Sequence, residues 1–271
     1  MARNRQEVSS PPLLCTIDRR GVAALTLNRP EVHNAYDDRL IDALIAECDR
    51  LAGMPGLRCV VIRGAGPHFQ AGADLKFLAR LRRAPDAANH EFSRRTVAAI
   101  RGLQEFPLPT LALVQGGCFG GGVGIVAACD IALAAADAVF ALSEVRWGIT
   151  PAPILPLLVD RIGARHTGRY ALTGERFDAI EARRIGLVHN FYPSRELEAA
   201  GARIVEAILL AGPEAVAVTK RLVAEAVDTP LEGAFRDRIV GEAAERRRSA
   251  EAQEGLLSFA ERRRPKWYPQ G

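Results

Sequence analysis

Several motifs that define common enzyme classes are missing from this chain of 271 residues. No Gly-Lys-Ser/Thr follows its glycine-rich segment, so a Walker A phosphate loop is excluded. The Gly-x-Gly-x-x-Gly pattern is met only in part, which argues against dinucleotide binding, and no Gly-x-Ser-x-Gly elbow of a serine hydrolase is present. The histidines are scattered without the spacing of metal ligands, so we expect no metal site. They are His33, His68, His90, His166 and His189.

Cysteine is scarce, and long apolar runs are absent. The cysteines are odd in number, form no CxxC pair and lie mostly in apolar contexts, which predicts buried free thiols in a reducing cytoplasm. They are Cys15, Cys48, Cys59, Cys118 and Cys129. The polar start MARNRQEVSSPP lacks the apolar core of a signal peptide, and no run reaches transmembrane length. We therefore expect a cytoplasmic protein without a membrane partner.

The charge is nearly balanced. A net charge of +4, from 36 basic and 32 acidic residues, gives no reason to expect nucleic acid, although it is compatible with a small anionic ligand. With 48% hydrophobic residues, the chain is long enough for one large domain with a sizeable core.

Hydrophobic patterning predicts short strands that alternate with helices. The turn Asp18–Gly21 predicts a hairpin between its flanking strands, and Asp37 or Asp38 is a candidate helix cap. Strands are expected over 13–17, 22–27, 59–62 and 110–114, with a strand end at 187–188. Helices are expected over about 38–51, 162–172, 179–185, 197–211, 213–227, 231–248 and 251–262. We divide the chain into an arm (1–12), a core (13–196) and a C-terminal helical region (197–271).

Two segments expose backbone in a way that suggests chemistry. Gly120, Gly121 and Gly122 precede a helical run, and free amides at a helix start favour an anion in front of them. Taken alone, the same glycines also fit a tight turn with close helix packing. Glu144, a lone carboxylate after an apolar run, follows 23 residues past Gly121, and an anion site with a nearby acid or base suggests enolate chemistry. The small-residue bend 68–75 is the second such segment.

Five segments together resemble the enoyl-CoA hydratase/isomerase, or crotonase, superfamily over residues 13–266. They are LNRPEVHNA (27–35), HFQAGADL (68–75), GGCFGGGVGIVAACD (116–130), FALSEVRWGITP (140–151) and SFAERRRP (258–265). The resemblance implies an α/β fold, a spiral of ββα turns with a C-terminal α-helical region used for trimerisation, as a homotrimer or dimer of trimers. It also implies an acyl-CoA thioester as substrate and no permanently bound cofactor.

The resemblance also assigns roles to individual residues. It implies an oxyanion hole formed by the amides of Ala73 and Gly121, with Glu144 as the catalytic acid or base. It implies coenzyme A contacts at Ala71 and Lys76, and at Phe259 and Arg262 supplied by a neighbouring subunit. Arginines on the last helix suit phosphate contact, although a solvated helical tail is the alternative. We expect residues 76–100 and 147–156, including Trp147, to form the pocket wall.

One position departs from the family pattern. Typical hydratases of this family carry a second glutamate where this chain has Gly124. The segments GGGVGIVAACDIA, ALSEVRWGI and RYALTGERFDA resemble bacterial 3-methylglutaconyl-CoA and isohexenylglutaconyl-CoA hydratase-like members most closely. The leading hypothesis is therefore a hydratase of a branched, glutaconyl-type enoyl-CoA. The alternatives are a Δ3,Δ2-enoyl-CoA isomerase with a single glutamate and a non-catalytic acyl-CoA-binding homologue.

Overall fold

The computed structural model describes residues 10–227 and 229–269 and contains two sheets. The larger sheet has six strands in the order β1-β2-β3-β4-β6-β9, in which only the β1–β2 pair is antiparallel. Its strands are β1 (Leu13–Ile17), β2 (Val22–Leu27), β3 (Cys59–Gly64), β4 (Thr110–Val114), β6 (Ile131–Ala135) and β9 (Asn190–Tyr192). The predicted hairpin is confirmed, because β1 and β2 join through the turn at Asp18 and Gly21.

A second sheet of three short strands lies beside the first. Its strands are β5 (Gly117–Phe119), β7 (Val139–Ala141) and β8 (Phe177–Asp178), in the order β5-β7-β8. The chain enters each sheet in turn, since β4 leads to β5 and β6 leads to β7 before a helical segment follows. This repeated strand-strand-helix path confirms the predicted spiral of ββα turns.

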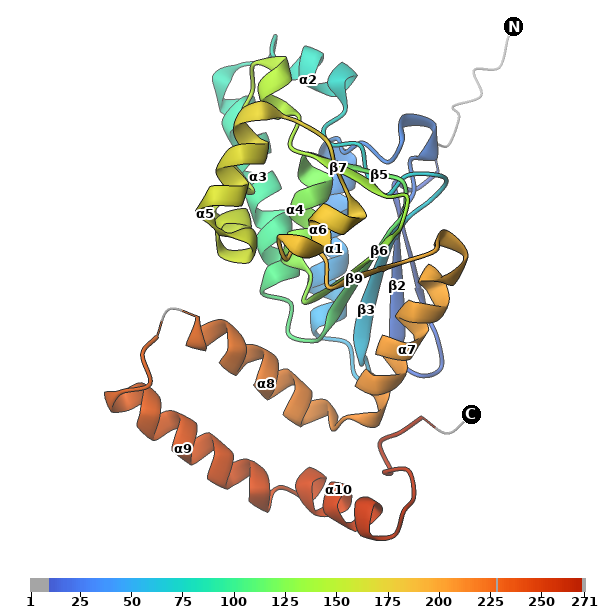
Figure 1. Cartoon of the computed structure of the whole chain (residues 1–271), viewed down its shortest axis with the longest axis vertical. Coiled ribbons are helices and arrows are strands. Elements are labelled where there is room, and N and C mark those ends of the chain that lie inside the picture. The colour runs from blue at the N-terminus through green and yellow to red at the C-terminus, as the bar shows by residue number, and fades with distance from the viewer. Residues whose placement is uncertain (1–9, 228, 270–271) are drawn as a thin grey trace, which may run out of the picture.

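Helices cover both faces of the larger sheet (Figure 1). On one face α1 packs on α3, α3 on α4 and α4 on α5, while α7 packs on β4, β6 and β9 from the other face. These helices are α1 (Asp38–Ala52), α3 (Asp86–Gln104), α4 (Gly121–Ala128), α5 (Leu155–Thr173) and α7 (Leu197–Leu210). The shorter ones are α2 (Leu75–Leu81), α6 (Ala179–Arg184) and the 3-10 helices η1 (Pro30–Val32), η2 (Glu144–Trp147) and η3 (Ser194–Glu196).

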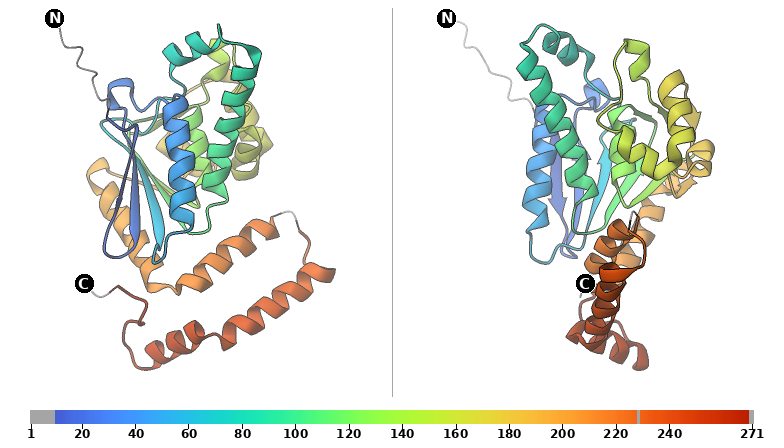
Figure 2. Two further views of the ribbon diagram at one scale, coloured as in Figure 1. Left: turned by 180° about the vertical axis from the view of Figure 1, so that it is seen from behind. Right: turned by 90° about the vertical axis from the view of Figure 1, so that its left-hand side faces the viewer.

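The last three helices lie at one end of the α/β body in both views of Figure 2. They are α8 (Pro213–Ala226), α9 (Gly233–Arg248) and α10 (Ala250–Ala260), which confirms a C-terminal helical region. The division at residue 196 stays a prediction, and α7, the first helix beyond it, buries Leu197, Val205 and Leu209 against the core. The residues of the predicted arm up to position 9 lie outside the described residues.

Local chemistry explains why most predicted elements form where expected. The Asp37 carboxylate accepts a hydrogen bond from the Leu40 amide at 3.0 Å and so caps α1, whose apolar positions face the core. Four of the five free cysteines are buried, as expected, and Cys15 is half-buried.

Two predicted boundaries are wrong. No strand ends at 187–188, because the amides of Leu187 and Val188 donate to the Ala182 carbonyl and close α6; the strand begins only at Asn190. Helix α5 begins at Leu155, seven residues before the expected 162, and it continues past a non-helical break at Gly163.

Candidate active site

A cavity of about 900 Å³ opens between α1, α2, α3, the start of α4 and η2. Its wall includes Ala71, Ala73, Gly121 and Glu144, four residues that the sequence predicted to act together. Leu78, Phe92, Ile100, Trp147 and Ile154 also line it, so both predicted wall segments are confirmed. The fold thus brings the bend 71–74, the glycine turn and Glu144 to one hollow.

The strand-like pairing with Tyr36 uses backbone groups of Gly72 and Asp74 and leaves the Ala73 amide unused. The Tyr36 amide donates to the Gly72 carbonyl at 2.9 Å, and the Asp74 amide donates to the Tyr36 carbonyl at 2.8 Å. Successive amides of an extended segment point to opposite sides, so the intervening Ala73 amide points away from Tyr36. It finds no acceptor among the described residues and is available to a ligand in the cavity that Ala73 lines.

The Gly121 amide is free because it is the first of α4. Gly120 takes a φ of 52°, which only glycine adopts readily, and its own amide donates to the Ala141 carbonyl at 2.9 Å. The next amides that bond within the helix are those of Val123 and Gly124, both to the Gly120 carbonyl. Within the described residues the Gly121 amide has no acceptor, as expected of a helix N-terminus.

Glu144 places a desolvated carboxylate against the glycine turn. A Cβ added at Gly120 would lie 2.7 Å from Glu144 Oε1, so the two groups are in close contact. Burial raises the pKa of Glu144 above its ordinary value of 4.5, and a backbone hydrogen bond only partly offsets this. Its Oε2 atom is buried and has no hydrogen-bond partner among the described residues. Such a carboxylate is suited to accept a proton.

Isoleucine side chains fill the space where a second acid would stand. A Cβ added at Gly124 would lie 2.4 Å from Ile154 Cγ2 and 3.5 Å from Ile100 Cδ1. Ile154 is buried at the end of the irregular segment before α5. The site is therefore apolar at the position of the second acid.

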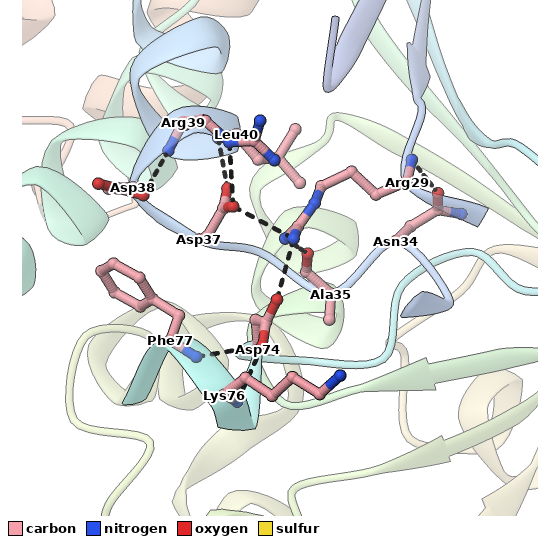
Figure 3. A network of polar contacts seen from close by, with 10 residues as sticks. All are labelled: Arg29, Asn34, Ala35, Asp37, Asp38, Arg39, Leu40, Asp74, Lys76 and Phe77. Atoms are coloured by element: carbon pink, nitrogen blue, oxygen red, sulfur yellow. Dashed lines mark hydrogen bonds and ion pairs between the residues drawn. The ribbon is translucent and has the colours of Figure 1, made fainter. Parts of the chain in front are cut away.

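A buried ion-pair network holds the two loops of the site together (Figure 3). Arg29 donates to Asp74 Oδ2 at 2.9 Å and to the Ala35 carbonyl, and it lies 3.2 Å from Asp37 Oδ2. Burial would raise the pKa of Asp74, but hydrogen bonds from Arg29 and from backbone amides lower it below its usual range. Because Asp37 caps α1 and Asp74 caps α2, Arg29 joins the starts of the two helices, and the paired residues Tyr36 and Ala73 lie directly before these caps.

Replacing Arg29 with alanine should lower the free energy of unfolding by about 3–5 kcal/mol, since two buried carboxylates lose their partner. Denaturant titration measures the change. Arg20→Ala is a matched control, because its ion pair with Asp18 is exposed and should contribute about 1 kcal/mol or less. Equal losses in the two variants would contradict the structural role of the network.

Three predicted contacts lie outside this cavity. Lys76 is exposed in the first turn of α2, where its amide donates to Asp74 Oδ1 at 2.9 Å. Phe259 is 86% exposed on α10, and Arg262 follows at its end. Figure 1 shows α10 at the opposite end of the molecule from α2, so one subunit does not bring these two residues to the cavity. Their predicted role through a neighbouring subunit stays a prediction.

Tyr36 was not predicted from the sequence to belong to the site. Its ring lines the cavity and lies against Gly121, where an added Cβ would be 2.5 Å from Tyr36 Cε1. The available signal was its place directly after the LNRPEVHNA segment, next to the helix cap Asp37.

Comparison with known proteins identifies the family. The model of the family described as enoyl-CoA hydratase/isomerase matches residues 18–270. The chain is 33% identical to the mevalonyl-coenzyme A hydratase sidH of Aspergillus fumigatus, covering 92% of each chain. It is 31% identical to the mitochondrial Delta(3,5)-Delta(2,4)-dienoyl-CoA isomerase of Dictyostelium discoideum, covering 92% of this chain and 88% of that protein. The solved structure of Pseudomonas aeruginosa AtuE superposes with a TM-score of 0.90 at 38% identity, covering 95% of this chain and 99% of AtuE.

The chain therefore belongs to the enoyl-CoA hydratase/isomerase family, whose members act on coenzyme A thioesters and generally need no further cofactor. The described residues contain no cluster of three or more acidic, histidine or cysteine side chains that could hold a metal ion. None of the helices in the described ranges is long and apolar enough to cross a membrane.

Proposed function

We propose that this protein is an enoyl-CoA hydratase that adds water across the 2,3 double bond of a branched, glutaconyl-type acyl-CoA. The observation that carries the proposal is one cavity lined by Ala73, Gly121 and Glu144, in which the two amides have no acceptor among the described residues and the carboxylate is buried. Preorganised amides stabilise the negative charge that develops on a thioester oxygen, and a desolvated carboxylate moves protons next to it.

In the proposed reaction Glu144 carries one proton from water to carbon. It accepts a proton from water as the water oxygen bonds to C3, and the electron pair of the C2–C3 double bond moves toward the thioester oxygen. The enolate oxygen is then held by the amides of Ala73 and Gly121. The electron pair returns, and C2 takes the proton from Glu144. One water is consumed and the carboxylate is restored.

Two arginines support a substrate with a carboxylate in its acyl tail. Arg146 and Arg176 line the cavity that contains Glu144, and neither forms an ion pair with a described residue. Arg176 lies over the Phe119 ring at 5.6 Å instead. Arginine binds carboxylates through paired hydrogen bonds, so these side chains suit a dicarboxylic acyl group.

We also propose that the protein is a homotrimer or a dimer of trimers, in which Phe259 and Arg262 of a neighbouring subunit join Ala71 and Lys76 around coenzyme A. Large apolar side chains on the last three helices are exposed in the single chain, which favours cover by another subunit. They are Val223, Val240, Leu256, Leu257 and Phe259. A cytoplasmic location stays a prediction.

A Δ3,Δ2-enoyl-CoA isomerase is the second candidate, and the packing at Gly124 favours it. Gly124 carries no carboxylate, and Ile154 and Ile100 lie where its side chain would be, so no second carboxylate assists a water molecule from this position. An isomerase needs only one base, which would take a proton from C2 and return it to C4.

Turnover in water labelled with heavy oxygen separates the two reactions. Purified protein is incubated with 3-methylglutaconyl-CoA and with a 3-enoyl-CoA, and the products are analysed by mass spectrometry. Hydration places the label in a 3-hydroxyacyl product, whereas isomerisation gives an unlabelled 2-enoyl product. An unlabelled product alone would overturn the hydratase proposal in favour of the isomerase.

The pH dependence of hydration should report the buried state of Glu144. The carboxylate must be ionised to accept a proton, and burial raises its pKa, so kcat/KM should fall as the pH drops through a value above 4.5. A pH–rate profile of the free enzyme measures this limb. An acid limb at or below 4.5 would contradict a desolvated base.

A further inference from the structure

Tyr36 faces the same glycine turn as Glu144. A Cβ added at Gly121 would lie 2.5 Å from Cε1 and 3.3 Å from Cζ of Tyr36, the carbon that carries the hydroxyl. A Cβ added at Gly120 would lie 2.7 Å from Glu144 Oε1. The α-carbons of Gly120 and Gly121 are about 3.8 Å apart. The Tyr36 phenol and the Glu144 carboxylate therefore lie against adjacent residues of the glycine turn.

The position of Tyr36 is fixed by its neighbours. Its backbone pairs with residues 72–74, its ring stacks on Phe92 with centroids 6.1 Å apart, and Arg29 binds the residues on either side of it. A side chain held in this way presents its hydroxyl in one place, which is a requirement for a precise role in a reaction.

The hydroxyl of Tyr36 is a neutral hydrogen-bond donor. Burial, and then the negative charge of Glu144, raise the pKa of Tyr36 well above its usual range, so the phenol stays protonated. Among the described residues it makes no hydrogen bond, and Glu144 Oε2 likewise has none. Two polar groups without hydrogen-bond partners on one wall of the cavity suit a small polar molecule between them.

We propose that Tyr36 is a further catalytic residue, whose hydroxyl donates a hydrogen bond to the oxygen of the water that is added at C3. This rests on the proposed hydratase function, and it supplies a second polar group in a site where Gly124 provides none. The water accepts from Tyr36 while it donates to Glu144. When the oxygen bonds to C3, Glu144 takes the proton of the breaking O–H bond, and Tyr36 keeps its own proton throughout.

Tyr36→Phe tests this role, because it removes the hydroxyl and keeps the ring that packs on Gly121. Two assays are run on the full-length protein. One is hydration of 3-methylglutaconyl-CoA. The other is exchange of the C2 hydrogens of butanoyl-CoA with heavy water, which uses Glu144 and the two amides but no water at C3. Tyr192→Phe is the matched control, since its hydroxyl bonds Asn190 at 3.2 Å on β9, outside the cavity wall.

We expect Tyr36→Phe to lower kcat/KM for hydration roughly 10- to 100-fold, the usual effect of a lost hydrogen bond to a reacting group. C2 exchange should stay near the wild-type rate, and Tyr192→Phe should change neither assay. Equal losses in both assays would mean that Tyr36 only shapes the site, and unchanged hydration would mean that it does not act; either result overturns the proposal. A wild-type protein that exchanges C2 hydrogens but hydrates no enoyl-CoA would overturn the proposed function itself, whatever Tyr36→Phe does.

Discussion

Replacing Glu144 with glutamine should reduce turnover of enoyl-CoA on the order of 10³-fold, whether the reaction is hydration or isomerisation. Glutamine keeps the shape of the side chain but cannot accept a proton, and Glu144 is the carboxylate in contact with the glycine turn. Affinity for a saturated acyl-CoA should change little, because the amides of Ala73 and Gly121 remain. Steady-state kinetics and calorimetric titration measure the two effects.

Glu105→Gln is the control for this substitution. Glu105 is exposed at the end of α3 and pairs with Arg101, so its loss should leave activity near the wild-type level. Two outcomes would contradict the role of Glu144. A fully active Glu144→Gln variant would exclude it as the acid or base. A wild-type protein that binds acyl-CoA yet turns over no member of a panel of enoyl-CoAs would support the non-catalytic homologue instead.

Adding a methyl group at Gly121 should give the second-largest loss of activity. Gly121→Ala would place Cβ 2.5 Å from the Tyr36 ring, so either the ring or the amide at the start of α4 must move. Loss of one oxyanion donor typically costs about 3 kcal/mol, and kcat/KM should therefore fall on the order of 10²-fold. Overpacking should also lower the free energy of unfolding by about 1–3 kcal/mol.

Gly168→Ala provides the matched control within a helix. A Cβ at Gly168, in α5, meets no atom within 4 Å, so this substitution should leave activity intact and slightly raise stability. If Gly121→Ala retained wild-type activity, the space over Gly121 would not be critical and its amide would not be finely positioned.

Turns and helix caps that depend on neighbouring residues could be predicted from the sequence. The Asp18–Gly21 turn, the Asp37 cap and the glycine turn before α4 each depend on residues within a few positions of one another. The resemblance then supplied Ala73 and Gly121 as the oxyanion hole, a role that stays a prediction, and neither amide has an acceptor among the described residues.

Contacts between distant segments were not predictable in the same way. Nothing near Gly124 in the sequence indicates that Ile154 fills its side-chain space, because that contact depends on how α5 packs on α4. The place of Tyr36 over Gly121 likewise joins residues 85 positions apart. Leu187 and Val188 are apolar enough for a strand, yet their amides close α6.

The most direct measurement is a crystal structure of the protein with a bound acyl-CoA. The proposed mechanism predicts the thioester oxygen about 3 Å from the amide nitrogens of both Ala73 and Gly121, with the Glu144 carboxylate facing C2 and C3. A thioester oxygen bound elsewhere, or a Glu144 side chain turned away from the acyl chain, would contradict it.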